Sequence, residues 1–290
     1  MIPSMNIVAW GKIAPWTEQR QVEQDLIISR ALVDIFTDPF LTEKLRFRGG
    51  TALNKLHFPA PLRYSEDIDL VRTEAGPIGE VLDGIRKVLD PWLGRATFIQ
   101  SPVAPKLRFK VPAEGGGEIR LKIEINTWKI EAYDPPRNIR FRVENPWFSG
   151  ETHVPTFSPE EMLATKLRAF LQRDKGRDLF DLNHALQVFD RLDTQRVVEC
   201  FLRYLEKSKV QISRANAEQR LFAKLNDRGF VADIRPLITP AQAEELTEEG
   251  IKHAFAAVFR RFITILPGDP WKRTDEMIEH FGLPIEMHGS

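Results

Sequence analysis

Apolar and polar residues alternate with two different periods in the first part of the chain. Within residues 17–37 the apolar side chains recur every three or four positions, which predicts an amphipathic helix with one buried face. In residues 45–49 and 66–72 apolar side chains are interspersed with charged ones over a short run, which predicts strands. Between these two strands a helical turn is expected to start directly after the glycine pair. After them a second amphipathic helix is expected over 77–93.

Strand-like segments dominate the next part of the chain. They cover 96–100, 105–111, 118–126 and 139–143. The Gly-rich segment 114–117 is typical of a hairpin turn. The first half is therefore predicted to be mixed α+β, with a small sheet of about five strands.

The pattern becomes helical after about residue 155. Ser158 and Pro159 form a typical helix start, and the last predicted helix is long, over 240–266. The chain is thus predicted to have an α+β fold with two domains: a small mixed-sheet domain with an N-terminal helix (1–155) and an all-helical domain (156–290).

The charge composition limits how this protein could bind a nucleic acid. A length of 290 residues fits about two domains, and 41 basic residues balance 41 acidic ones. With no net charge there is no overall basic field, so a nucleic acid would have to be held by a local patch. Two candidates are the segment 207–214 and a set in the first half: Arg46, Arg48, Arg63, Lys106, Arg108 and Lys110.

Two further features bear on location. There is one cysteine, which argues against a disulfide framework and fits a reducing cytoplasm. No apolar run approaches a membrane span, and the first residues lack the apolar core of a signal peptide. We therefore expect a cytoplasmic protein with no membrane partner.

Two acids interrupt the strand 66–72. Asp67 and Asp69 are two residues apart, so on a strand they point to the same face. Adjacent carboxylates repel each other unless a cation lies between them, and Mg²⁺ prefers such oxygen ligands. Glu124, on a neighbouring strand with Lys122 on the same face, is a candidate third ligand. The competing interpretation is a solvated pair of aspartates on an edge strand.

The glycine pair that precedes this strand argues against a merely solvated pair of aspartates. Gly49 and Gly50 end one strand and Thr51 begins a helix. Such a turn lets a phosphate approach the backbone and the first N–H groups of the helix. A tight turn without a ligand is the simpler interpretation of the glycines alone, but strand, Gly-Gly-Thr, helix and an acidic strand in succession place an anion cradle before a metal site.

The segments "FRGGTALNKL…RYSEDIDLV" and "EEMLATKLRAFLQRDKGRDLFDL" resemble the AbiEii/AbiGii nucleotidyltransferase toxins, including the MenT-type toxins, within the DNA polymerase β-like nucleotidyltransferase superfamily. The resemblance extends from "WGKIAPW" to at least residue 190. It implies that Gly49, Gly50 and Thr51 bind nucleotide, and that Asp67, Asp69 and Glu124 bind Mg²⁺ or Mn²⁺. Two positions depart from the superfamily pattern: Thr51 stands where serine is usual, and Glu124 where aspartate is usual.

A basic helix and an acidic helix complete the resemblance. Lys166 and Arg173 are seven residues apart, so they share a helix face, and Asp178 and Asp181 share a face of the next helix. Surface ion pairing is the simpler interpretation of these residues. The resemblance implies instead that Lys166, Arg173 and Arg177 bind nucleotide phosphates from the second domain. It also implies that Lys166, Asp178 and Asp181 are catalytic, together with Asp67 and Asp69.

Ser65, two residues before Asp67, is a candidate regulatory position. A phosphate there would place negative charge beside the expected metal site and block the nucleotide.

The sequence thus predicts a metal-dependent nucleotidyltransferase toxin of a bacterial toxin–antitoxin system, of the type IV-like, abortive-infection kind. Its substrate would be a nucleoside triphosphate, its acceptor an RNA such as the 3′ end of a tRNA, and its partner a cognate antitoxin. Two alternatives remain at this point: an enzyme that modifies protein hydroxyls, similar to AMPylation, and a non-catalytic nucleotide-binding protein.

Overall fold

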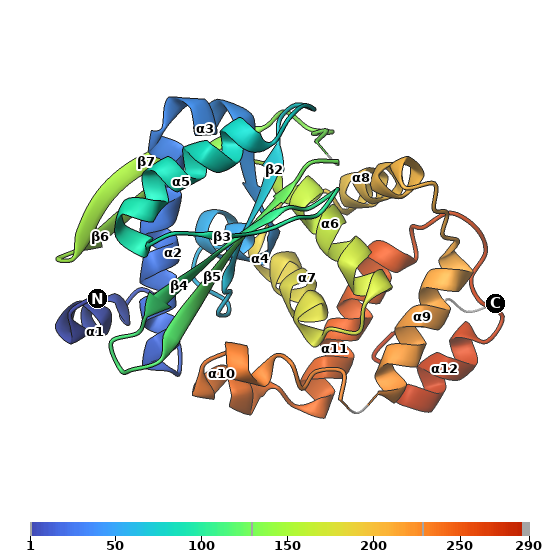
Figure 1. Ribbon diagram of the computed structural model, residues 1–290. Helices are drawn as coiled ribbons and strands as arrows, with labels where there is room; N and C mark the ends of the chain where they lie inside the picture. The colour runs from blue at the N-terminus through green and yellow to red at the C-terminus, as the bar shows by residue number, and fades with distance from the viewer. Residues whose placement is uncertain (1, 129, 228, 286–290) are drawn as a thin grey trace. The chain divides into compact units, whose positions relative to one another are not determined.

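The computed structural model describes residues 2–128, 130–227 and 229–285 (Figure 1). The chain divides into two compact units, Met1–Ser158 and Pro159–Ser290. The first holds all of the described strands, and the second is built from helices. Each unit is described by itself.

A single mixed sheet forms the centre of the first unit, with the strand order β3-β4-β5-β2-β1-β7-β6. Its members are β1 Leu45–Arg48, β2 Asp67–Arg72, β3 Thr97–Ile99, β4 Lys106–Pro112, β5 Glu118–Asn126, β6 Arg137–Asn145 and β7 Phe148–Thr156. Strand β2 pairs antiparallel with β1 and parallel with β5. It is therefore a central strand, and the edge-strand interpretation of its aspartates was wrong.

The sheet has seven strands, where about five were predicted: all six strand-like segments form strands, and the sequence pattern did not reveal β7. This strand contains Gly150 and Pro155, residues that are depleted in strands and obscure the alternation. It forms a long hairpin with β6 and joins the sheet through one parallel pairing, Phe47 with Thr156. The Gly-rich turn predicted at 114–117 does connect β4 and β5.

Helices pack around this sheet. They are α1 Ser4–Trp10, α2 Gln19–Thr37, α3 Pro39–Lys44, α4 Gly49–Ala52, the π-helix η1 Leu53–His57 and α5 Gly79–Leu93. In β2 and β5 the aliphatic residues are buried and alternate with the charged ones. Helix α2 contacts β5 and β7, and α5 contacts β4. Asp67 and Asp69 of β2 and the charged residues of β5 thus lie on the opposite face from this core.

The second unit is a helical bundle. Its elements are α6 Pro159–Gln172, α7 Gly176–Val188, α8 Thr194–Lys207, α9 Arg214–Asn226, η2 Arg235–Leu237, α10 Pro240–Glu245, α11 Glu248–Val258, η3 Phe259–Ile263 and α12 Thr274–Phe281. Phe222 packs against Phe255 and Phe259 in its core, and Cys200 is buried. None of the described helices is long and apolar enough to cross a membrane.

The long helix predicted over 240–266 is three shorter elements. Thr247 interrupts it because its side chain accepts a hydrogen bond from the Gly250 N–H and caps α11. A threonine that caps a new helix ends the preceding one, and the periodicity of the apolar residues does not show this break.

Candidate functional site

Strand β2 brings together the acids that the sequence singled out. Asp67 is in register with Lys122 of β5, and Asp69 is in register with Glu124. Side chains of residues directly opposite each other on neighbouring strands lie on the same face. The three acids and Lys122 therefore share one face of the sheet.

Two of the three carboxylates already have a cation. Lys122 Nζ lies 2.7 Å from the Asp67 carboxylate, and Lys106 Nζ lies 3.1 Å from that of Glu124. Asp69 differs. Its burial raises its pKa, the neighbouring Asp67 and Glu124 raise it further, and Arg48 opposes them. An ionised Asp69 is therefore costly, and a cation beside it would relieve that cost.

The donor set at this place suits a hard divalent ion. Asp67 and Asp69 offer only oxygen atoms, which is the ligand type of Mg²⁺ and Mn²⁺. Within the described residues no three His, Cys, Asp or Glu side chains are already arranged around a possible ion position. Asp67 and Asp69 thus fit the metal as a pair, and Glu124 as a third ligand remains a prediction.

The glycine turn lies directly against this acidic strand. Helix α4 begins at Gly49, two residues before the predicted start, and Gly49 itself has a φ of +84°. A Cβ atom on Gly49 would lie 2.3 Å from the Asp69 carboxylate oxygen Oδ2. Only glycine permits both the backbone angle and this close approach. The turn and the acid expected to act together are therefore in van der Waals contact.

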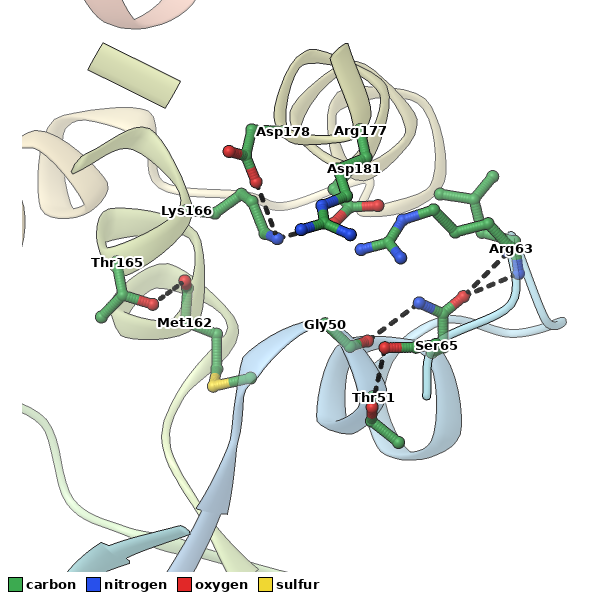
Figure 2. A network of polar contacts seen from close by, with 12 residues as sticks. Gly50, Thr51, Arg63, Ser65, Met162, Thr165, Lys166, Arg177, Asp178 and Asp181 are labelled. Atoms are coloured by element: carbon green, nitrogen blue, oxygen red, sulfur yellow. Dashed lines mark hydrogen bonds and ion pairs between the residues drawn. The ribbon is translucent and has the colours of Figure 1, made fainter. Parts of the chain in front are cut away.

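Hydrogen bonds tie the same turn to the start of β2 (Figure 2). The Thr51 hydroxyl donates to the Asp67 carbonyl at 2.5 Å and lies 2.8 Å from the Ser65 hydroxyl. The Asn54 amide donates to the Gly50 carbonyl. These bonds fix the position of Gly50, Thr51 and Ser65 relative to Asp67.

Sequence reasoning missed Asn54 as the residue that organises this region. Its Oδ1 atom accepts from the N–H groups of Leu62 and Arg63, at 2.9 and 3.1 Å. Asn54 thereby holds the segment before β2 against the helix that follows the glycines. Its place three residues after Thr51 was the available signal, since a buried polar residue in such a turn needs partners.

In the second unit, four of the predicted residues form one ionic cluster: Lys166, Arg173, Asp178 and Asp181. Figure 2 shows Lys166 with the two aspartates. Lys166 Nζ lies 3.1 Å from Asp178 and 2.8 Å from Asp181. Arg173 donates two hydrogen bonds to Asp178, at 2.7 and 2.9 Å. Both aspartates are fully buried, and Lys166 is only 7% exposed, so these three residues form an interior ion cluster and not a surface one.

The electrostatics of this cluster favour its charged form. Burial acts to raise the pKa of Asp178, but Lys166 and Arg173 outweigh it and the pKa is lowered. The hydrogen bond to Asp178 raises the pKa of Arg173. Arg177 forms an ion pair with a different acid, since its Nε atom lies 3.8 Å from Asp233. The structure thus brings together Lys166, Arg173, Asp178 and Asp181, while Arg177 pairs elsewhere.

Comparison with known proteins identifies the family of this chain. The family described as "Nucleotidyl transferase AbiEii toxin, Type IV TA system" matches residues 30–261, which is most of the chain. No curated protein sequence matches.

Solved structures give a likeness in fold. The nucleotidyltransferase toxin MenT4 from Mycobacterium tuberculosis superposes with a TM-score of 0.64 at 18% identity, over 99% of this chain and 100% of that one. JHP933 from Helicobacter pylori is also similar, with a TM-score of 0.46 at 16% identity over 92% and 90% of the two chains. The likeness to MenT4 agrees with the predicted α+β fold class.

Proposed function

Because this chain belongs to the AbiEii family of nucleotidyltransferase toxins from type IV toxin–antitoxin systems, we propose that it transfers a nucleotidyl group from a nucleoside triphosphate to the 3′ end of an RNA. A tRNA is the acceptor we favour, since the sequence motifs resemble those of MenT-type toxins. The observation that carries this proposal is the contact between the Gly49 turn and the Asp69 carboxylate, because it joins a phosphate cradle to a pair of metal-binding acids.

The acids and the glycine turn of the first unit would each have a role in this reaction. Asp67 and Asp69 would hold Mg²⁺ or Mn²⁺, which when bound neutralises phosphate charge and polarises the reacting oxygens. The backbone N–H groups at Gly50 and Thr51 would bind phosphate oxygens. The Thr51 hydroxyl, bonded to the Asp67 carbonyl, keeps the cradle and the acid in register.

The second unit would supply cations. We propose that Lys166, Arg173 and Arg177 neutralise nucleotide phosphates, and that Asp178 and Asp181 position Lys166 through the ion pairs described above. The acceptor hydroxyl oxygen would form a bond to the α-phosphorus as the bond to pyrophosphate breaks, and the hydroxyl proton would leave. Such chemistry depends on positioning and charge stabilisation.

A labelling experiment tests the proposal. Purified protein is incubated with each α-labelled triphosphate, Mg²⁺ and either total RNA or total protein, and the products are digested with RNase. We expect RNase-sensitive label on RNA with the native protein and none with Asp67→Ala. Label on protein would favour a protein hydroxyl as acceptor, and transfer by Asp67→Ala would refute the site.

The family also implies a biological partner. We propose that a separately encoded antitoxin counteracts this enzyme in the cytoplasm. Induced expression in a bacterial host, with and without the neighbouring gene, tests this. Growth arrest that the neighbouring gene relieves is expected for the native chain and absent for Asp67→Ala.

Ser65 offers a place for control of the same site. Its hydroxyl lies 2.8 Å from that of Thr51, so a phosphate on Ser65 would put negative charge beside the cradle. We expect Ser65→Glu to lose nucleotide binding and Ser65→Ala to retain it. Full activity of Ser65→Glu would contradict this role.

A further inference from the structure

The charged face of the sheet continues beyond the acids into a cationic region on β4 and β5. Arg108 of β4 is directly opposite Lys122 of β5, and Lys110 is directly opposite Arg120. Lys122 in turn is opposite Asp67 of β2. We call Arg108, Lys110, Arg120 and Lys122 the cationic ladder; it starts at the acidic strand and leads away from it on the same face.

The ladder places like charges against each other. Side chains directly opposite on antiparallel strands are about 5 Å apart at Cβ, and like charges there destabilise the sheet. Two successive pairs, Arg108 with Lys122 and Lys110 with Arg120, are both of this kind. A repeated unfavourable pairing on an exposed surface indicates that something other than fold stability maintains it.

Few acids in this region offset the ladder. Lys122 is paired with Asp67, and Lys110 is 3.7 Å from Glu118, with both of these side chains about half exposed. In the part of the chain that the structure describes, no ion pair joins Arg108 or Arg120 to an acid, and both are exposed. The ladder therefore keeps an excess of positive charge, although the whole chain has none.

The second hairpin of the same sheet shows the alternative arrangement. Arg142 of β6 is directly opposite Glu151 of β7, and Arg140 forms two hydrogen bonds of 2.7 Å with the same carboxylate. These arginines are exposed as those of the ladder are, yet they are matched by an acid. An unmatched set of cations is thus a property of the β4–β5 hairpin and not of this sheet in general.

From this geometry we propose that the cationic ladder binds the sugar–phosphate backbone of the RNA acceptor. Guanidinium groups such as those of Arg108 and Arg120 suit phosphate oxygens. The ladder lies on the same sheet face as Asp67 and Asp69, so a strand held there leads toward the acids. For the identity of the polyanion, the inference rests on the proposed function.

The test is a binding titration without triphosphate, so that it does not depend on transfer. A fluorescently labelled, mixed-sequence 20-nucleotide RNA is titrated with the full chain and with the double variant Arg108→Gln/Arg120→Gln. The Kd should rise about tenfold, and the slope of log Kd against log salt should decrease by roughly one, as for the loss of one or two phosphate contacts. The temperature of unfolding should be unchanged or higher, because like-charge repulsion is removed.

Arg140→Gln/Arg142→Gln is the matched control. It removes the same charge from exposed positions two residues apart in the same sheet, and it should leave RNA binding unchanged while unfolding at an equal or lower temperature. Equal loss of RNA binding in both double variants, or no loss in the ladder variant, would overturn the proposal. Ladder-dependent binding to phosphatidylglycerol vesicles but not to RNA would also overturn it and assign the ladder to a membrane surface.

The two proposals fail separately. If the native protein binds RNA through the ladder but labels no acceptor, the ladder is upheld as an RNA-binding surface and the transfer reaction is refuted. If it labels RNA and the ladder variant binds as the native protein does, the reaction is upheld and the ladder is refuted.

Discussion

Two charged regions of this molecule differ in how far their charges are matched by opposite charges within the chain. In the second unit, Lys166 and Arg173 face Asp178 and Asp181, so two buried acids are matched by two cations. On the sheet of the first unit, burial and two neighbouring acids raise the pKa of Asp69, and among the described residues no acid forms an ion pair with the arginines of the ladder. The cluster of the second unit is compensated within the chain. In the first unit Asp67 and Glu124 have lysine partners, but Asp69 is compensated only in part.

This difference shows what each region needs from outside. A compensated cluster is stable without a ligand and serves equally well to fasten α6 to α7, so the role of Lys166 in catalysis depends on the family and must be tested. An uncompensated region has stability to gain from a cation at Asp69 and an anion at the ladder. The first unit is therefore where the charges themselves indicate a ligand.

Replacement of Asp69 by asparagine gives the largest expected effect. If Asp69 is uncompensated, Asp69→Asn removes a repulsive, partly buried charge, so the metal-free protein should unfold at the same urea concentration or higher. Nucleotidyl transfer should fall at least ~10³-fold, about 4 kcal/mol in activation free energy. Urea titrations with EDTA and initial rates measure the two quantities. A marked loss of stability would show that Asp69 is compensated within the chain, and the comparison would fail.

Replacement of Lys166 by methionine should give the reverse result. Methionine fills a similar volume but leaves Asp178 and Asp181 without the lysine charge, and loss of one partner from a buried ion cluster costs about 3 kcal/mol. Urea unfolding measures the loss, and Lys166→Arg, which keeps the charge, is the control. A Lys166→Met variant as stable as the native chain would mean that the cluster does not depend on this ion pair.

How far the sequence predicted these regions follows from the range of the interactions involved. The shared face of Asp67 and Asp69 was predictable because strand alternation is local, and so was the pairing of Asp178 and Asp181 on one helix face. Three other features could not be predicted: the central position of β2, the like-charge pairs of β4 with β5, and the burial of Lys166. They depend on strand order, register and helix packing, which join residues far apart in the chain.

Acid titration should separate the two units. Burial lowers the pKa of His57 in the first unit from 6.5 to about 4. A lowered histidine pKa contributes stability that is complete above 6.5 and is lost as pH falls toward 4, at most about 3 kcal/mol for this shift. The lowered pKa of Asp178 contributes stability above its unfolded value of 3.8 that is lost only at lower pH. The first unit should thus weaken at a higher pH than the second.

Urea midpoints at a series of pH values, followed by amide exchange in each unit, measure this order. In His57→Gln the loss of stability between pH 6.5 and 4 should largely disappear, whereas Asp178→Asn should leave that window unchanged. If both units weaken in the same pH range in the native chain, the burial of His57 does not govern the first unit.

The smallest expected effect concerns the link between the cradle and the acidic strand. Thr51→Val keeps the shape of the side chain but removes the hydroxyl that donates to the Asp67 carbonyl, while Thr51→Ser keeps the hydroxyl. Loss of one such bond costs about 1 kcal/mol, so Thr51→Val should unfold at a slightly lower urea concentration than Thr51→Ser. Expressed as free energies, the loss in transfer rate should exceed the loss in stability, because Thr51 holds the phosphate cradle against the acidic strand. If Thr51→Val and Thr51→Ser transfer nucleotide at the same rate, the hydroxyl serves the fold alone, and only Asp69 and the ladder would then distinguish the first unit from the second.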